Sequence, residues 1–205
     1  MRVRAALSSV ANITCTFAGL IGTRNLDLYG NLTFTTTYYA SVIRLTPTAS
    51  NLVPSITVRT GAWFQMDGPT TFYGPCRVDN FGTLLLQSSA SFVDAFQIVN
   101  QPTGNIVIGA GATRIDYSGS ASCSCANNDA TVCPTLQNLG FIRFQQPTAD
   151  DIKYHINTGL PVPQFQLLVR VVNADSGTIQ VPTGSRLQFF FRSEEHTSEL
   201  QSHLN

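Results

Sequence analysis

The sequence predicts an all-β protein: a right-handed parallel β-helix, or β-solenoid, of about six coils, truncated at one or both ends. Two observations carry this prediction. A short phrase of apolar residues, Asn and Gly recurs along the chain, and the interval between copies matches about one turn of a solenoid. In addition, no segment has convincing helical periodicity. The alternative that short alternating strands also allow is an antiparallel β-sandwich.

The recurring phrase reads apolar, any residue, Asn, one or three residues, Gly, any residue, apolar, any residue, apolar. Its copies are VDNFGTLLL from Val78, IVNQPTGNIVI from Ile98, LQNLGFIRF from Leu136 and VVNADSGTIQV from Val171. Apolar alternation indicates a strand with one buried face, and the glycine marks a corner with little room for a Cβ atom. If the coils stack, the asparagines stack too and form a ladder of amide hydrogen bonds.

A second phrase lacks the asparagine. It reads ITVRTGAWFQM from Ile56 and IQVPTGSRLQF from Ile179. The segment from Leu84 has the same frame, and the segment from Ile106 departs from it by one residue. GNLTF from Gly30 is an eroded copy. The shortest interval between strand starts, Leu84 to Ile106, is 22 residues, which is one bare turn of a parallel solenoid. A repeat that cannot bury its own face alone must stack on its neighbours.

The phrases also sort side chains by direction, because successive strand residues point to opposite faces of a sheet. Trp63 is expected to point outward, where it is either covered by a long loop or a candidate sugar-stacking platform assisted by Tyr73 or Tyr39. The residues expected to point inward are Ile56, Val58, Phe64, Met66, Leu84, Leu86, Phe92, Ile106, Ile108, Ile142, Phe144, Ile179, Val181, Leu187 and Phe189.

The pattern VxNxGTLxV…TGSxLxF resembles the coils of right-handed parallel β-helix proteins, notably autotransporter-type adhesin stalks and pectin-lyase-like domains. The resemblance covers roughly Gly30 to Phe191 and specifies a fold, not a single function. It implies either a structural and adhesive stalk or an enzyme of the pectin-lyase-like kind. Such enzymes place clustered Asp, or Asp with Arg or Lys and calcium, on one exposed sheet.

The chain is expected to fall into three parts. Residues 1–29 form a poorly defined N-terminal segment or a first partial coil, residues 30–191 the β-solenoid domain, and residues 192–205 a non-native tail. RSEEHTSELQS, Arg192 to Ser202, resembles the in-frame translation of a sequencing-library adapter and holds the chain's only glutamates. Such a scar is excluded from fold reasoning. The alternative for this stretch is a short polar helix beginning at Ser193.

The charge of the chain restricts its partners. Lys and Arg number 12, Asp and Glu number 12, and the formal net charge is zero. Nucleic-acid binding, which needs a basic stripe, is therefore not expected. No run approaches the roughly 20 apolar residues of a transmembrane segment. A surface of Ser, Thr, Asn and Gln suits glycans or another cell-surface protein as partners, together with further repeats of the full-length chain, and no cofactor is expected.

The cysteines and two sequons favour an extracellular or cell-surface location. Cys123, Cys125 and Cys133 crowd one loop, and a disulfide from Cys133 to Cys123 or Cys125 is expected, with Cys76 reaching the leftover partner. Zinc is the alternative, but the spacing is poor for a four-ligand site, so no metal is assigned. The expected glycosylation sites are Asn12, in Asn-Ile-Thr, and Asn31, in Asn-Leu-Thr.

The surplus residues between strands fall in three loops, which are expected to leave the coils at one corner and build a glycan-contacting flank. That flank gathers Tyr73, Asp129, Asp150, Asp151, Lys153, Tyr154 and His155.

Asp150 and Asp151 are the closest approach to a pair of carboxylates for glycoside hydrolysis. Neighbouring strand residues point to opposite faces, however, so no catalytic residue is assigned. The function expected is that of a structural or adhesive extracellular β-helix fragment with glycan binding among its roles. The alternative is a polysaccharide lyase or glycoside hydrolase of the same fold. Whether the chain is an enzyme stays open, with the balance towards no.

Overall fold

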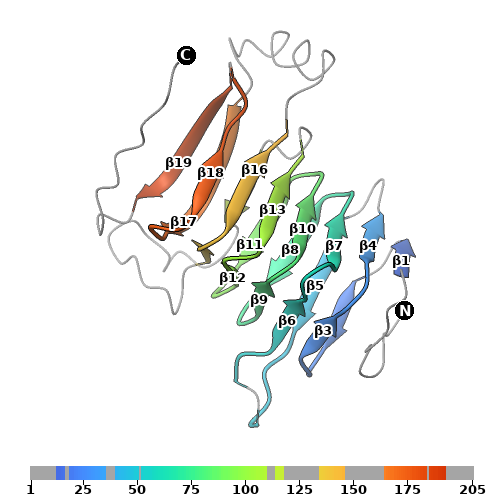
Figure 1. Cartoon of the computed structure of the whole chain (residues 1–205). Helices are drawn as coiled ribbons and strands as arrows, with labels where there is room; N and C mark the ends of the chain where they lie inside the picture. The colour runs from blue at the N-terminus through green and yellow to red at the C-terminus, as the bar shows by residue number, and fades with distance from the viewer. Residues whose placement is uncertain are drawn as a thin grey trace.

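The computed structural model describes residues 13–16, 19–35, 40–50, 52–109, 114–117, 134–145, 164–183 and 185–192. Within these residues the chain is all-β and contains no helix, and its strands stack one above another along a single axis (Figure 1). Every strand pairing among them is parallel, which confirms the β-helix and excludes the antiparallel sandwich. The three stacks of strands are named here columns A, B and C, and their solvent-facing sides faces A, B and C.

Column A is a seven-stranded sheet. Its strands are β1 (Ile13–Thr16), β4 (Leu32–Thr35), β7 (Trp63–Met66), β10 (Thr83–Leu86), β13 (Asn105–Ile108), β16 (Phe141–Phe144) and β18 (Thr178–Gln180). Column B holds β2 (Leu20–Gly22), β5 (Ser41–Leu45), β8 (Thr70–Tyr73), β11 (Ala90–Val93) and β14 (Arg114–Tyr117). Column C holds β3 (Leu26–Leu28), β6 (Ser55–Val58), β9 (Arg77–Asn80), β12 (Gln97–Asn100) and β15 (Thr135–Asn138).

Columns B and C join into one 12-stranded sheet through β17 (Gln164–Asn173). The first half of this ten-residue strand pairs with β14 in column B, and its second half pairs with β15 in column C. The last strand, β19 (Arg186–Arg192), follows β17 past the corner with a register shift between Leu167 and Arg170. Six coils and the start of a seventh result, in the order A, B, C, and the first coil lies before Gly30.

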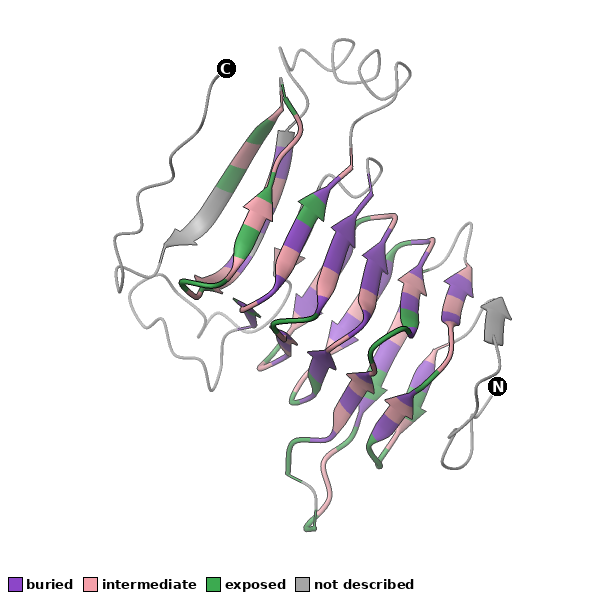
Figure 2. Cartoon of the chain, in the orientation of Figure 1, coloured by how far each residue is buried: buried purple, intermediate pink, exposed green. Residues whose placement is uncertain are grey.

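The core is a continuous column of inward side chains. Figure 2 marks the buried residues, which recur on every strand from β4 to β16. Of the predicted inward residues, those from Ile56 to Phe144 are all at most 3% exposed. Ile179, Val181 and Leu187 are partly buried against the same core, and the side chain of Phe189 is not described. Aromatic rings link successive coils edge to face, as where the ring centroids of Phe72 and Phe92 lie 5.4 Å apart.

The predicted register was wrong for one copy of the repeat. Leu84, Ile106 and Ile179 start strands of column A, but Ile56 lies in column C and pairs with Val78. The corner between columns C and A and the corner between columns A and B have the same sequence pattern: a strand, a small residue and another strand. The local sequence therefore does not distinguish the two corners. Trp63 nevertheless points outward as predicted, and it is 45% exposed.

The predicted asparagine ladder is present at the end of column C. The side-chain Nδ2 of Asn80 donates to Oδ1 of Asn100 at 2.8 Å, Asn100 donates to Asn138 at 2.7 Å, and Asn138 donates to Asn173 at 2.7 Å. Each of the first three amides also donates to a backbone carbonyl at the start of the column A strand two coils further along, those of Asn105, Phe141 and Thr178 in turn. The ladder satisfies polar groups that would otherwise be buried without partners.

Glycines line the corner beside this ladder because the coils approach each other too closely for a side chain. A Cβ atom on Gly104 would overlap the carbonyl oxygen of Asn80, and one on Gly140 would overlap that of Gln101. Neither glycine has a positive φ, so the requirement is space rather than a left-handed backbone. The glycine of the recurring phrase therefore marks the contact between successive coils, as the sequence predicted.

Two of the three segments predicted to form one flank lie outside the described residues, and the strands on either side show that they connect different pairs of columns. Residues 118–133 connect β14 in column B to β15 in column C, whereas residues 146–163 connect β16 in column A to β17 in column B. The segment from Gln65 to Arg77 is not an inserted loop, because β8 occupies its centre. The prediction of a single flank was wrong in these respects, since the strand that each loop follows can be identified only once the register is known.

Candidate functional site

A row of outward side chains crosses face A along the axis of the solenoid. The strand register aligns Trp63 of β7 with Thr83 of β10, Asn105 of β13, Phe141 of β16 and Thr178 of β18. Trp63 is exposed and Phe141 is partly exposed. Two aromatic rings thus start from the same position on strands three spacings apart, a separation of about 14 Å between backbones at about 4.8 Å per strand. We name these four side chains, Trp63, Thr83, Asn105 and Phe141, the aromatic row.

Between the two aromatic rings the aromatic row offers polar groups without charge. Thr83 contributes a hydroxyl and Asn105 an amide, and the Oδ1 atom of Asn105 is buried without a hydrogen-bond partner. An acceptor left unsatisfied in this way costs on the order of 1–3 kcal/mol. A donor supplied by a bound molecule would recover part of that cost after a rotation of the amide.

The second outward row of face A is apolar and buried at its centre. Leu85 and Val107 point outward, yet they are only 7% and 4% exposed. Gln65 and Arg143 occupy the same row on the flanking strands. Next to Trp63, Gln65 donates to the carboxylate of Asp67 at 2.6 Å, and Thr35 donates to the same carboxylate at 3.3 Å. These two bonds fix a hydrogen-bonding edge along the aromatic row.

Tyr73 lies on a different face from Trp63, so the structure does not bring these two predicted residues together. Tyr73 ends β8 on face B, where the guanidinium of Arg44 lies 5.6 Å from the centroid of its ring. A cation stacked on an aromatic ring contributes about 0.5–1 kcal/mol at an exposed site. Tyr73 is thus a partner of Arg44 and does not form the predicted platform with Trp63, and Tyr39, the other predicted partner of Trp63, lies outside the described residues.

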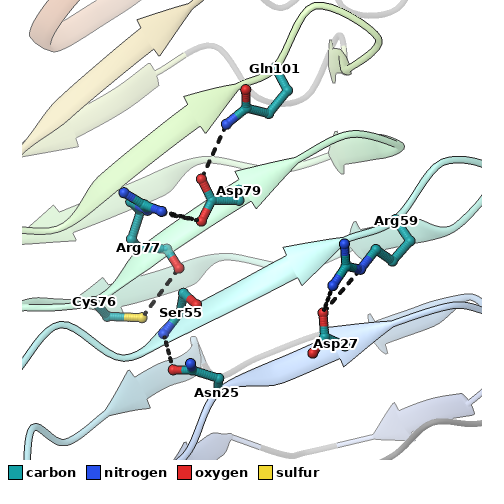
Figure 3. A network of polar contacts seen from close by, with 8 residues as sticks. All are labelled: Asn25, Asp27, Ser55, Arg59, Cys76, Arg77, Asp79 and Gln101. Carbon is teal, nitrogen blue, oxygen red and sulfur yellow. Dashed lines mark hydrogen bonds and ion pairs between the residues drawn. The ribbon is translucent and has the colours of Figure 1, made fainter. Parts of the chain in front are cut away.

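Face C carries the ion pairs of the described chain (Figure 3). Arg59 donates from Nη2 to Asp27 at 2.6 Å, joining the second coil to the first. Arg77 donates from Nε to Asp79 at 2.9 Å within β9, and Gln101 of the next coil donates to the same carboxylate at 3.3 Å. The hydrogen bond to Asp27 raises the pKa of Arg59.

The carboxylates on face C do not form a catalytic pair. Asp27 and Asp79 share one outward row, but Thr57 lies between them, so their strands are two spacings or about 10 Å apart. Each is bound to its own arginine. Glycosidase carboxylates lie about 5–9.5 Å apart and act directly on the sugar bound between them, whereas both of these carboxylates are held in ion pairs.

Cys76, a predicted disulfide cysteine, is a free thiol at the start of β9 and is fully buried in the core. Desolvation by burial raises the pKa of this thiol to about 12, and the thiol donates to the carbonyl of Arg77 at 3.9 Å. A thiol of this kind is inert, because the thiolate is the reactive form. The other predicted disulfide cysteines, Cys123, Cys125 and Cys133, lie outside the described residues.

Most of the predicted binding flank also lies outside the described residues: Asp129, Asp150, Asp151, Lys153, Tyr154 and His155. The same is true of the sequon at Asn12, whereas Asn31 lies partly exposed in the turn before β4. Across the described ranges, no three His, Cys, Asp or Glu side chains gather where they would hold a metal ion. The described chain also has no helix that meets the length and hydropathy needed to cross a membrane.

Sequence reasoning found Trp63 but missed Phe141, its counterpart on the aromatic row. Both residues stand immediately before the first inward residue of a column A strand, Phe64 and Ile142. That shared position is visible in the sequence once the copy that starts at Ile56 is aligned with the asparagine phrase. Its asparagine position is then Val58, which pairs with Asn80.

Comparisons of the chain with protein-family models, with curated proteins and with solved structures find no match. The fold and the chemistry of its three faces are therefore the basis for the function proposed below.

Proposed function

We propose that this chain is part of an extracellular or cell-surface β-helix protein with a structural and adhesive role, and that face A binds a neutral glycan along the solenoid axis. The aromatic row is the observation that carries the proposal. It places two aromatic side chains in line, about 14 Å apart, with a hydroxyl and an amide between them.

The chemistry of a sugar chain matches this arrangement. The apolar face of a sugar ring stacks on an exposed aromatic ring, while its hydroxyls need donors and acceptors at the edges. Trp63 and Phe141 supply the two platforms, and Thr83, Asn105 and Gln65 supply neutral polar groups. An extended oligosaccharide long enough to reach both platforms gains both stacking contacts, whereas a shorter one gains a single contact. Affinity is therefore expected to rise with chain length until both platforms are occupied.

The extracellular part of the proposal rests on the sequence. The sequon at Asn31 lies at a partly exposed turn, and a cysteine-rich loop at 123–133 is typical of chains that mature in an oxidising compartment. The adhesive part rests on the shape of the fold, because a parallel solenoid presents long flat faces to a partner.

Intrinsic fluorescence gives a direct test, because Trp63 is the chain's only tryptophan. We expect titration with neutral oligosaccharides of increasing length, chosen from a glycan array, to change its emission with an affinity that rises with length. Trp63→Ala is expected to weaken binding at least tenfold, a loss of about 1.4 kcal/mol or more, in a measurement that does not use fluorescence, such as calorimetry.

Phe141→Ala is expected to lower the affinity for long oligosaccharides. It is expected to leave unchanged the affinity for short oligosaccharides, which contact Trp63 alone. The matched control is Tyr73→Ala, which removes a partly exposed aromatic ring from face B. Glycans that bind the Trp63→Ala and Phe141→Ala variants as tightly as the wild type would rule out face A as the binding surface.

A further inference from the structure

A hollow of about 230 Å³ opens on face C, away from the aromatic row. It lies over three neighbouring strands, β12, β15 and the second half of β17. The outward side chains that line it are Gln97, Val99, Thr135, Gln137, Arg170 and Val172. Sites that enclose a drug-sized ligand measure about 300–1,000 Å³, so this hollow has room for one small ring or chain end.

Arg170 is the only charged side chain in the lining of the hollow. Its position in column C is that of Arg77, since the register runs from Arg77 through Gln97 and Thr135 to Arg170. Arg77 donates to Asp79, two residues further along its own strand, at 2.9 Å. The equivalent residue beside Arg170 is Val172, whose side chain has no hydrogen-bond acceptor. The fold thus repeats the cation of this pair without repeating its carboxylate.

The guanidinium of Arg170 has unused hydrogen-bonding capacity. Among the described residues it forms no ion pair, and its Nε atom is buried without an acceptor. A buried donor without a partner costs on the order of 1–3 kcal/mol. Arg59 and Arg77 of the same face, in contrast, are each bound to an aspartate.

We propose that the hollow binds a small carboxylate-bearing ligand rich in hydroxyl groups, the chemistry of a uronic acid, with Arg170 as the cation that takes the carboxylate. A planar guanidinium matches a carboxylate with two parallel N–H···O bonds. The amides of Gln97 and Gln137 and the hydroxyl of Thr135 face the same space and suit hydroxyl groups. Val99 and Val172 form the apolar part of the lining. This site lies on a different face from the aromatic row and does not depend on the function proposed for it.

The test is calorimetric titration of the full chain with glucuronate, glucose and glucose 6-sulfate. We expect glucuronate to bind and glucose to bind at least tenfold more weakly, and binding of glucuronate to weaken as salt is added. Glucose that binds as well as glucuronate would overturn the role of the charge. Glucose 6-sulfate that binds as tightly as glucuronate would overturn the assignment of a carboxylate.

Two independent variants test the role of Arg170. Arg170→Gln removes the cation and is expected to weaken glucuronate binding at least tenfold. Val172→Asp rebuilds the geometry of Arg77 and Asp79, so an internal carboxylate should occupy Arg170 and weaken binding to a similar extent. Val172→Asn introduces a side chain of the same shape as Asp but without its charge, and this variant is expected to keep most of the affinity for glucuronate. Arg143→Gln, which removes an exposed arginine from face A, serves as the control for net charge.

Arg170 and Val172 are both partly exposed, so their variants are expected to retain the fold. Far-UV circular dichroism checks that they do. Unchanged binding in Arg170→Gln, or equal losses in the Asp and Asn variants at position 172, would refute the proposal. Neither result bears on the aromatic row, because the Trp63→Ala and Phe141→Ala variants test that site separately.

Discussion

The corner at the end of column C differs between the first two coils and the four that follow. Leu28 and Val58 occupy it in coils 1 and 2, and Asn80 begins the amide ladder in coil 3. The corner is fully buried in both cases, since Val58 and Asn80 are each 0% exposed. An apolar stack is held by area removed from water and tolerates any side chain of suitable volume. An amide stack has a direction, and each member depends on the next.

The direction of the amide stack leaves one hydrogen-bond acceptor unsatisfied where the amide stack meets the apolar stack. Every Asn in the ladder donates towards the later coils, so Asn80, the first of them, has no donor for its own Oδ1 atom. Val58 lies on that side of Asn80 and offers only methyl groups. The ladder therefore begins with one unsatisfied acceptor, and the apolar stack has no such defect at its end.

Breaking the ladder at its centre should have the largest effect. Asn100→Leu keeps the side-chain volume close to that used at Leu28, but it leaves Oδ1 of Asn138 without its donor and Nδ2 of Asn80 without one of its acceptors. We expect the free energy of unfolding to fall by about 3 kcal/mol, measured by urea denaturation followed by circular dichroism. The control is Val99→Thr on the outward side of the same strand, which should change stability by less than about 0.5 kcal/mol. Equal effects would show that the ladder contributes nothing specific.

Cys76 tests a buried polar atom outside the ladder, at the opposite end of the strand that holds Asn80. The pKa of its thiol is raised to about 12 in the folded protein, compared with about 8.5 in an unfolded chain. The stability that this thiol contributes is therefore complete below about pH 8.5 and is lost as the pH rises towards 12. In that window the wild type should lose up to about 1.4 kcal/mol per pH unit more than Cys76→Val does.

The measurement is denaturant unfolding of both proteins at a series of pH values. The difference between the two free energies of unfolding removes the contributions of the tyrosines and arginines, which titrate in both proteins. Parallel curves above pH 9 would mean that Cys76 does not titrate with this shift.

Extending the ladder by one coil should have the smallest effect and sharpens the comparison most. In Val58→Asn the new amide can donate to the orphaned Oδ1 of Asn80, which offsets the apolar area that is lost. We expect its stability to stay within about 1 kcal/mol of the wild type. Leu28→Asn, one coil further from the ladder, places an amide beside Val58 and should cost at least about 2 kcal/mol. Equal costs at the two positions would contradict the view that a ladder grows only from an existing end.

The sequence predicted the fold because its strongest signal, the Asn and Gly phrase, encodes contacts between coils. Asn100 and Gly104 are constrained by what lies directly above and below them, and such constraints repeat in sequence. Faces were harder to predict, since outward residues are under no such constraint. Ile56 was placed in the wrong column because its copy has Val58 where the asparagine should stand, and this error hid the alignment of Trp63 with Phe141.

Arg170 could not be identified as unpaired from the sequence alone. Arg77 with Asp79 and Arg170 with Val172 are equivalent only after the strand register is known. The residues predicted for a binding flank were chosen for their chemistry on long loops. Of these, Tyr73 lies on a regular strand, where it contacts Arg44.

The strand β17 has a consequence for errors of alignment. In the first five coils columns B and C are built by separate strands, so one strand can slip by a residue while the other keeps its pairing. In the sixth coil a single continuous strand pairs with β14 at one end and β15 at the other. Because a slip of one residue exchanges inward and outward side chains, a slip here would turn Phe165 and Leu167 outward at one end of β17 and Val171 outward at the other. The alignment of columns B and C in the sixth coil is therefore set together, whereas β19 pairs with the two halves of β17 at registers that differ by one residue.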